Sequence, residues 1–114
     1  MSQLEKDIER LKDCLNPERE KINIIEQCRI VYDALRNKDS QYYRNTQGFI
    51  ELLDVSENKV SKMMIIHRKM HPQLKEWFSG TDYQMNTAYM VGRMSHKAQL
   101  EWLHNVEILE GKHT

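Results

Sequence analysis

The stretch that decides the fold is residues 45–64, NTQGFIELLDVSENKVSKMM. It contains two short runs with apolar residues at helical spacing, separated by Asp54, Val55 and Ser56. This spacing is typical of a helix-turn-helix, in which two helices meet at a steep angle across a turn of about three or four residues. Asn45 and Ser56 precede the two runs, and both residue types are preferred helix N-caps. The segment predicts a helix over 46–53 and a second helix from Ser56 to about Met70.

Apolar side chains stand where such a motif needs them. Phe49 and Leu53 are expected to face inward from the first helix and Val55 to fill the turn. Val60 and Met63 are expected to anchor the second helix, because they lie on one face of it at helical spacing.

Two positions depart from the usual motif. Asp54 stands where glycine is common, and Asp can adopt the left-handed conformation of that turn at moderate cost. Ile50 stands where a small residue is usual, so we expect a different packing angle between the two helices.

Helical patterns continue on both sides of the motif. Before it, two amphipathic helices are predicted, and Asn16 and Pro17 are expected to open the second one, which runs to about Asn37. Their apolar residues are Leu4, Ile8, Leu11 and Leu15, then Ile22, Ile25, Cys28, Val31, Tyr32 and Leu35. After the motif, His71-Pro72, Ser79-Gly80 and Ser95 divide three further helices. Their apolar residues are Leu74, Trp77 and Phe78; Met85, Ala88, Tyr89 and Val91; and Leu100, Leu103, Val106 and Leu109.

The fold class is therefore all-α, a multi-helix bundle that contains a helix-turn-helix and an N-terminal helical pair. We divide the chain into the pair, residues 1–38, and the helix-turn-helix domain, residues 39–114. The pair either packs on the rest of the fold or mediates dimerisation. Its two apolar stripes exceed what a peripheral hairpin needs to cover a compact helical core, so we expect some of this surface to find a partner in a homodimer.

Length and composition indicate one small domain of 114 residues. The longest apolar run, residues 63–66, is far shorter than the roughly 20 residues of a membrane-spanning helix, and residues 1–13 do not form a secretory signal. We expect a cytoplasmic protein without a membrane span. Cys14 and Cys28 fall at apolar helix positions without the spacing of a redox or zinc motif, so both are predicted to be reduced core thiols.

The charges are balanced overall but unevenly distributed. The chain has 17 basic and 17 acidic residues, which argues against a protein that coats nucleic acid regardless of its sequence. Residues 58–97, however, hold seven lysines and arginines against Glu76 and Asp82, a net charge of +5. Such a region fits a DNA-binding surface or an ordinary solvated one.

Three segments in this order resemble the central DNA-binding domain of the ParB/KorB family of partition proteins and related regulators. LLDVSENKVSKMM (52–64) is similar to the family's LGxSxxxVSxxL segment, HPQLKEWF (71–78) to its LPxEVxxLL helix, and YQMNTAYMV (83–91) to its ISxGHARAL helix. The resemblance covers roughly residues 45–106 and implies a recognition helix over 56–66. The arginine-rich box and the N-terminal domain that bind CTP in full-length ParB proteins are absent. It therefore implies neither CTP hydrolysis nor sliding along DNA.

The resemblance also implies a set of DNA contacts. Residues near the N-terminus of a recognition helix reach base edges in the major groove, where Asn58 can pair with adenine, lysines can donate to guanine and Glu57 can accept from cytosine. Thr46 and Gln47 stand at the start of the preceding helix, which suits phosphate contacts. The candidate DNA-binding residues are Thr46, Gln47, Ser56, Glu57, Asn58, Lys59, Ser61, Lys62, Arg68, Lys69, Asn86, Thr87, Arg93 and Lys97.

Other chemistry has little support in the sequence. His67 and His71 are four residues apart, a spacing that can chelate a metal on a helix, but no third ligand is close in sequence. No glycine-rich phosphate loop, nucleophile motif or carboxylate pair is present. We expect no catalytic activity, no metal site and no cofactor.

These observations predict a sequence-specific double-stranded DNA-binding protein. It would act as a transcriptional regulator or as a plasmid or phage partition adaptor, and it would bind a short site as a homodimer. The alternative is a protein-protein interaction module on a helix-turn-helix scaffold, which the zero net charge and Glu57 favour.

Overall fold

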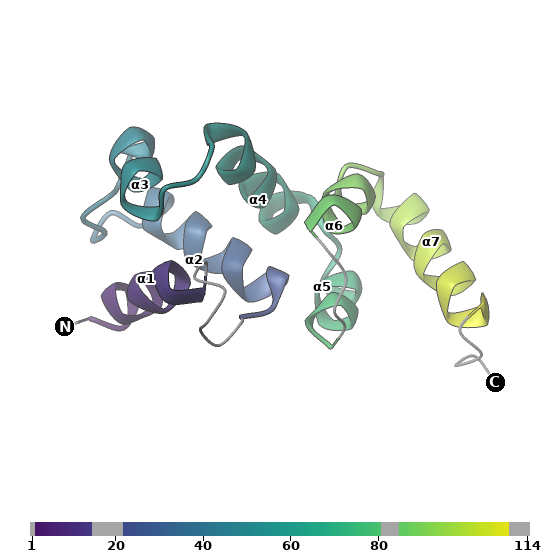
Figure 1. The fold of residues 1–114 in the computed structure, drawn as a ribbon. Coiled ribbons are helices and arrows are strands. Elements are labelled where there is room, and N and C mark those ends of the chain that lie inside the picture. Colours follow the sequence, from purple (N-terminus) through teal and green to yellow (C-terminus); the bar gives the residue numbers. More distant parts are fainter. Residues whose placement is uncertain (1, 15–21, 81–84, 110–114) are drawn as a thin grey trace.

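The structure, a computed structural model, describes residues 2–14, 22–80 and 85–109. These residues form seven α-helices and no strand (Figure 1), which confirms the predicted all-α class. The helices are α1 (Gln3–Cys14), α2 (Ile24–Arg36), α3 (Thr46–Leu53), α4 (Glu57–Lys69), α5 (Pro72–Ser79), α6 (Met85–Gly92) and α7 (His96–Leu109). Among the described helices, none has the length and apolar character needed to cross a membrane.

The helix-turn-helix consists of α3 and α4, and its capping residues are the predicted ones. Asn45 accepts a hydrogen bond from the Gly48 backbone N–H at 3.0 Å, and Ser56 accepts one from the Lys59 N–H at 3.1 Å. Asp54 ends α3 in the left-handed conformation, with φ 55° and ψ 50°. The turn therefore has the expected geometry although aspartate replaces the usual glycine.

The predicted motif core is also confirmed. Phe49, Leu53, Val60 and Met63 are buried, and Val55 is half-buried against the same core. Burying each large apolar side chain contributes about 1.5 to 3 kcal/mol relative to leaving it in water. The apolar side chains that helical spacing places on one face of each helix therefore stabilise the crossing of α3 and α4.

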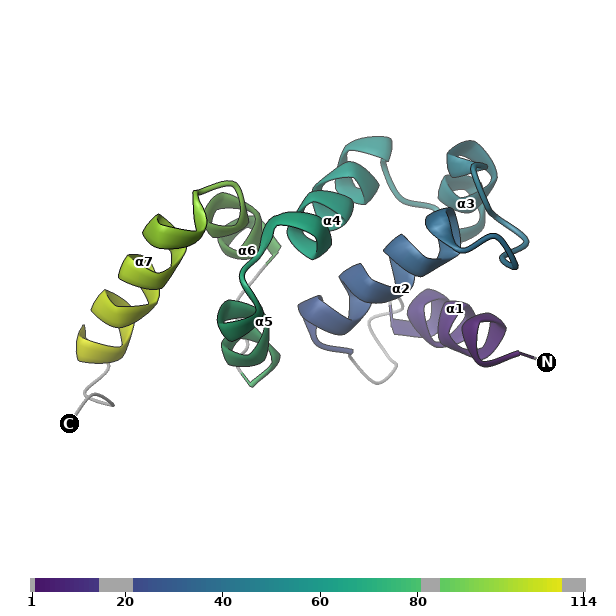
Figure 2. The same ribbon diagram turned by 180° about the vertical axis from the view of Figure 1, so that it is seen from behind.

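The central helix of the fold is α2. It packs against α1, α3, α4 and α5, and both views show it lying between α1 and α4 (Figures 1 and 2). Ile30, Val31 and Ala34 have no exposed surface. The N-terminal pair and the helix-turn-helix therefore share one apolar core.

Because the core is shared, the apolar stripes of the N-terminal pair are not surplus surface that needs a partner. Ile8, Leu11, Cys28, Val31 and Leu35 are buried in the same cluster as the helix-turn-helix side chains. For the described part of residues 1–38, which does not include Leu15, the expectation of a large unused apolar surface is wrong, because α2 is covered by several helices rather than by one. Dimerisation stays a prediction without this support.

The start of α2 also differs from the prediction. Asn16 and Pro17 lie outside the described residues, but α2 begins only at Ile24, where Asn23 accepts a hydrogen bond from the Glu26 N–H at 2.9 Å. Ile22 is held outside the helix because its N–H donates to the Cys14 sulfur at 3.1 Å and its carbonyl accepts from Gln27 at 2.6 Å. A helix that continues from Pro17 through Ile22 is therefore wrong.

Both cysteines lie in the core, as predicted, and no disulfide joins them. Burial raises the pKa of the Cys28 thiol to about 12, which keeps it protonated and unreactive.

A buried carboxylate joins α1 to α2. Asp7 is only 3% exposed and accepts hydrogen bonds from Gln3 at 3.0 Å and Arg29 at 3.2 Å. Arg29 also pairs with Glu26 and, at 2.8 Å, with Asp33. Burial would raise the pKa of Asp7, but the hydrogen bonds from Gln3 and Arg29 and the charges of Arg29 and Arg10 lower it below its ordinary value of 3.8.

We expect Asp7→Asn to lower the free energy of unfolding by about 1 to 3 kcal/mol at neutral pH, since it removes charge-assisted hydrogen bonds. The pKa of Asp7 is lower in the folded chain than in the unfolded one, so its stabilisation is present above the unfolded value and is lost as the pH falls through the folded value. Urea denaturation of both proteins should therefore show a difference at neutral pH that shrinks in acid.

Asp13→Asn is the matched control, because Asp13 is an exposed carboxylate on the same helix. It should change the free energy of unfolding by less than about 0.5 kcal/mol. A difference between wild type and Asp7→Asn that stays constant with pH would contradict the proposed role of the Asp7 charge.

The last helix, α7, is attached by a buried polar side chain. Gln99 has no exposed surface, and its Oε1 accepts from the His71 N–H at 2.7 Å. Its Nε2 donates to the carbonyls of Lys69 at 3.1 Å, Gly92 at 3.3 Å and Met94 at 2.9 Å, so three acceptors share two hydrogens. Gln99 thus connects α7 with the ends of α4 and α6 and the start of α5.

The apolar face predicted for the last helix contributes less than expected. Leu100, Leu103 and Val106 are half-buried, and Leu109 is 85% exposed. Trp102 supplies a further contact, because its ring stacks on Phe78 of α5 with centroids 5.7 Å apart.

We expect Gln99→Leu to reduce the free energy of unfolding by several kcal/mol, because each buried polar group left unsatisfied costs about 1 to 3 kcal/mol. Gln99→Glu should be at least as harmful, since it places an acceptor oxygen opposite three carbonyls. Asn105→Leu, at an exposed position of the same helix, is the control. Urea denaturation followed by tryptophan fluorescence measures the effect, and equal stability of the Gln99 and Asn105 variants would show that Gln99 is dispensable.

Candidate nucleic-acid interface

The side of α4 that faces away from the core carries most of the candidate positions. Val60, Met63 and Ile66 turn into the core and leave the opposite side open. Among all candidates, the exposed ones are Thr46, Gln47, Ser56, Glu57, Asn58, Ser61, Arg68, Lys69, Asn86, Arg93 and Lys97. Lys59, Lys62 and Thr87 are half-buried.

Several of these residues have local structural roles. The Ser56 hydroxyl is the N-cap of α4, and Glu57 in the first turn is favourable to the helix dipole. Gln47 donates a hydrogen bond to Glu51 on the same helix at 3.2 Å. These three side chains are explained by helix stability, whereas Asn58, Ser61 and Thr46 are exposed without such a role.

Two cations, one on α4 and one directly after the end of α6, share one aromatic ring. The Lys62 ammonium lies 5.3 Å from the centre of the Tyr89 ring, and the Arg93 guanidinium also lies 5.3 Å from it. An aromatic face attracts a cation by about 0.5 to 2 kcal/mol, so Tyr89 holds both side chains in place. The positive charge of α4 is thereby brought close to the one that follows α6.

Asn86 and Tyr89 are three residues apart and so lie on the same side of α6, and Arg93, which directly follows this helix, reaches the Tyr89 ring. Asn58 and Lys62 are likewise at i and i+4 on α4. We call the surface formed by Asn58, Lys62, Asn86, Tyr89 and Arg93 the α4–α6 face. α4 packs against α6, and the contacts of Lys62 and Arg93 with Tyr89 join the two parts of this surface.

In the part of the chain that the structure describes, no carboxylate pairs with the cations of this surface. Between described residues, the ion pairs of arginine and lysine lie on α1 and α2 and involve Asp7, Arg10, Glu26, Arg29 and Asp33. None of the candidate lysines and arginines pairs with a carboxylate of a described residue. The net positive charge found in the middle of the sequence is therefore available to an external anion.

The remaining basic candidates form a second group. Arg68 and Lys69 occupy the last turn of α4, about 17 Å along the helix from Glu57 at a rise of 1.5 Å per residue. The His96 ring contacts the Lys69 carbonyl at 3.1 Å, which brings the neighbouring residue Lys97 to this end of α4. The structure thus separates Arg68, Lys69 and Lys97 from the N-terminal end of α4.

The two histidines considered as metal ligands are engaged elsewhere. The His67 ring lies against Tyr32, with centroids 4.5 Å apart, and burial together with the charge of Lys75 lowers the pKa of His67. His71 lies beyond the end of α4 and caps α5, its Nδ1 accepting from the Gln73 N–H at 3.0 Å. No group of three or more metal-ligating side chains occurs among the residues that the structure describes.

Two residues that the sequence did not single out matter to this surface. Tyr89 was assigned to an apolar helix face, although its spacing from Asn86 and Arg93 is a signal that it shares their side of α6. Gln99 carries a weaker signal, a polar residue within an otherwise apolar stripe.

Comparisons of the chain with protein-family models, curated proteins and solved structures find no match.

Proposed function

We propose that this protein binds double-stranded DNA at a specific sequence, with α4 as the recognition helix in the major groove. The role of such a protein would be that of a transcriptional regulator or of a plasmid or phage partition adaptor in the cytoplasm. The observation that carries the proposal is the α4–α6 face, which joins a capped helix-turn-helix to cations that no described carboxylate neutralises.

The geometry suits a division of labour between bases and phosphates. Asn58 and Lys59 stand near the N-terminus of α4, where a recognition helix reads base edges. Lys62 and Arg93 are fixed on Tyr89 and present two positive charges at one place, which suits the DNA backbone. Thr46, at the exposed start of α3, would contact the backbone on the other side of the groove.

A homodimer on two half-sites belongs to this proposal. A single recognition helix reads only a few base pairs, and pairing two of them multiplies the discrimination between sites. The surface that would join the two subunits is not identified by the apolar stripes of α1 and α2, because these are buried in the core.

Selection of bound sites from random duplex DNA tests the proposal directly. We expect one short motif to be enriched, and we expect its affinity to fall steeply with salt, because each neutralised phosphate releases counterions. Recovery of random sequences with no enriched motif would contradict sequence-specific binding.

On the selected site, Lys59→Ala and Lys62→Ala should each weaken binding by about 1 to 3 kcal/mol, as the loss of one base or phosphate contact does. Circular dichroism should show unchanged helical content, since neither side chain belongs to the core. Full affinity in both variants would remove α4 from the DNA interface.

Tyr89 supplies a sharper test, because it need not touch DNA itself. We expect Tyr89→Leu to weaken binding about three- to tenfold, since Lys62 and Arg93 lose the ring that positions them. Tyr89→Phe keeps the ring face and should retain most of the affinity. Titrations measure both, and equal losses in the two variants would show that the hydroxyl, rather than the ring, is what matters.

A protein-protein interaction module is the second candidate function. The exposed Glu57 at the start of α4 and the net charge of zero favour it, because both are unfavourable toward phosphates. Retention on a duplex-DNA column separates the two functions. A DNA-binding protein should elute later as salt is lowered, whereas an interaction module should not be retained.

A further inference from the structure

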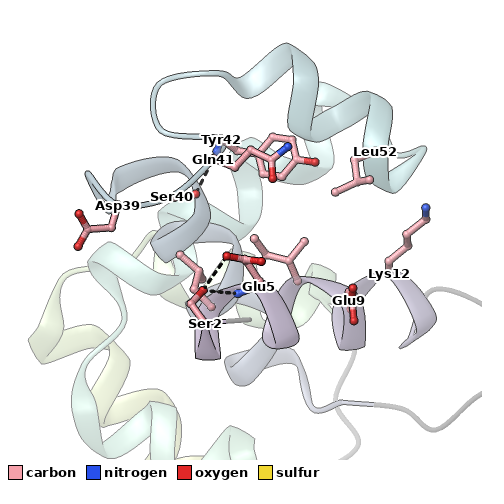
Figure 3. Close-up of a pocket in the computed structure, with 11 residues that line it drawn as sticks. Ser2, Glu5, Glu9, Lys12, Asp39, Ser40, Gln41, Tyr42 and Leu52 are labelled. Carbon is pink, nitrogen blue, oxygen red and sulfur yellow. Dashed lines mark hydrogen bonds between the residues drawn. The ribbon is translucent and has the colours of Figure 1, made fainter.

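A groove lies on the side of the molecule formed by α1, the α2–α3 connection and the end of α3. Its volume is about 430 Å³, within the range of peptide and ligand pockets. Figure 3 shows Asp39 at one end and Lys12 and Leu52 at the other, with Glu5 and Glu9 between them along α1. None of the candidate DNA-binding residues lines it.

Each wall of the groove has an apolar part that is supported from inside the protein. Leu4 and Ile8 of α1 line one wall, and Tyr42 and Leu52 line the other. The Tyr42 ring is fixed against Phe49 of the core, with centroids 5.4 Å apart, and Ile8 itself belongs to the core. These walls can therefore receive apolar side chains without rearranging.

The rim is acidic. The charged residues that line the groove are three acids, Glu5, Glu9 and Asp39, and one base, Lys12, so the groove carries a net charge of −2. None of the three carboxylates forms an ion pair with a described residue, although Glu5 accepts a hydrogen bond from the Ser2 hydroxyl at 3.3 Å. In contrast, Asp7 of α1 and Glu26 and Asp33 of α2 all pair with Arg29. The acids of the groove are thus left for a partner while the neighbouring acids hold the fold together.

We propose that this groove binds a short basic amphipathic segment of another protein. Its apolar side chains would lie against Leu4, Ile8 and Leu52, and its lysines or arginines would pair with Glu5, Glu9 and Asp39. DNA is excluded as the occupant because the acidic rim repels phosphates. The groove and the α4–α6 face share no residue, so the segment binds whether or not the protein also binds DNA.

The probe is a synthetic peptide of leucine and lysine at helical spacing, titrated into the ¹⁵N-labelled full chain and followed by NMR. We expect saturable shifts confined to α1, residues 39–42 and the end of α3. A matched peptide with glutamate in place of each lysine should cause none, since only the sign of its charge differs.

Two triple variants distinguish binding at the groove from a general effect of the net charge of the chain. Glu5→Gln/Glu9→Gln/Asp39→Asn should bind the lysine peptide at least about tenfold more weakly than wild type. Asp13→Asn/Glu76→Gln/Glu101→Gln removes the same charge from exposed positions outside the groove and should bind as wild type does. Circular dichroism of both variants checks that they are folded.

Three outcomes would overturn the proposal. The first is equal weakening in the two triple variants, which would mean general attraction between opposite charges. The second is a set of shifts on another surface or no saturable shift. The third is concentration-dependent shifts of the groove residues without peptide, which would make a second copy of the chain the occupant.

Discussion

The packing of α2 against α4 is the contact on which the rest of the structure depends. α4 must bury Val60, Met63 and Ile66 while leaving its other side open, and α2 provides the apolar surface that makes this possible. α3 covers one end of the α2–α4 pair, and the left-handed conformation of Asp54 sets the direction of α3 relative to α4. α1 and α5 close the remaining sides of α2. The helix-turn-helix is therefore not a unit placed beside an N-terminal hairpin, because its second helix is held by that hairpin.

Charges are divided between two regions of the molecule. Arg29 gathers the carboxylates of Asp7, Glu26 and Asp33, so the acids of α1 and α2 that approach the core are used to hold these helices together. Lys62 and Arg93 have an aromatic ring in place of a carboxylate partner. A ring orders a cation without cancelling its charge. The result is a chain with no net charge that still presents one surface suited to anions and, on α1, a groove suited to cations.

The sequence predicted the features that depend on local chemistry. Asn45, Ser56 and the His71-Pro72 step mark helix ends through hydrogen bonds and backbone restrictions within a few residues, and the structure has helix ends at all three. The prediction from the sequence was wrong where two candidate helix caps have the same local chemistry. Asn16 and Asn23 are both good caps, and only the contacts of Ile22 with Cys14 and Gln27 define where α2 starts. The roles of Gln99 and Tyr89 were missed because they depend on which helices meet, which periodicity does not encode.

The candidate interface depends on Gln99, a buried side chain that is not part of it. Tyr89 can hold Lys62 only if α6 keeps its place on α4, and the two helices are in contact where Gly92 meets Ile66. Gln99 binds the carbonyls of Gly92 and Met94 at the end of α6 and that of Lys69 at the end of α4. It therefore fixes these two helix ends relative to each other from inside the protein. Because Lys62 stands on α4 and Arg93 directly follows Gly92, this buried amide supports from inside the protein the arrangement in which both cations reach Tyr89.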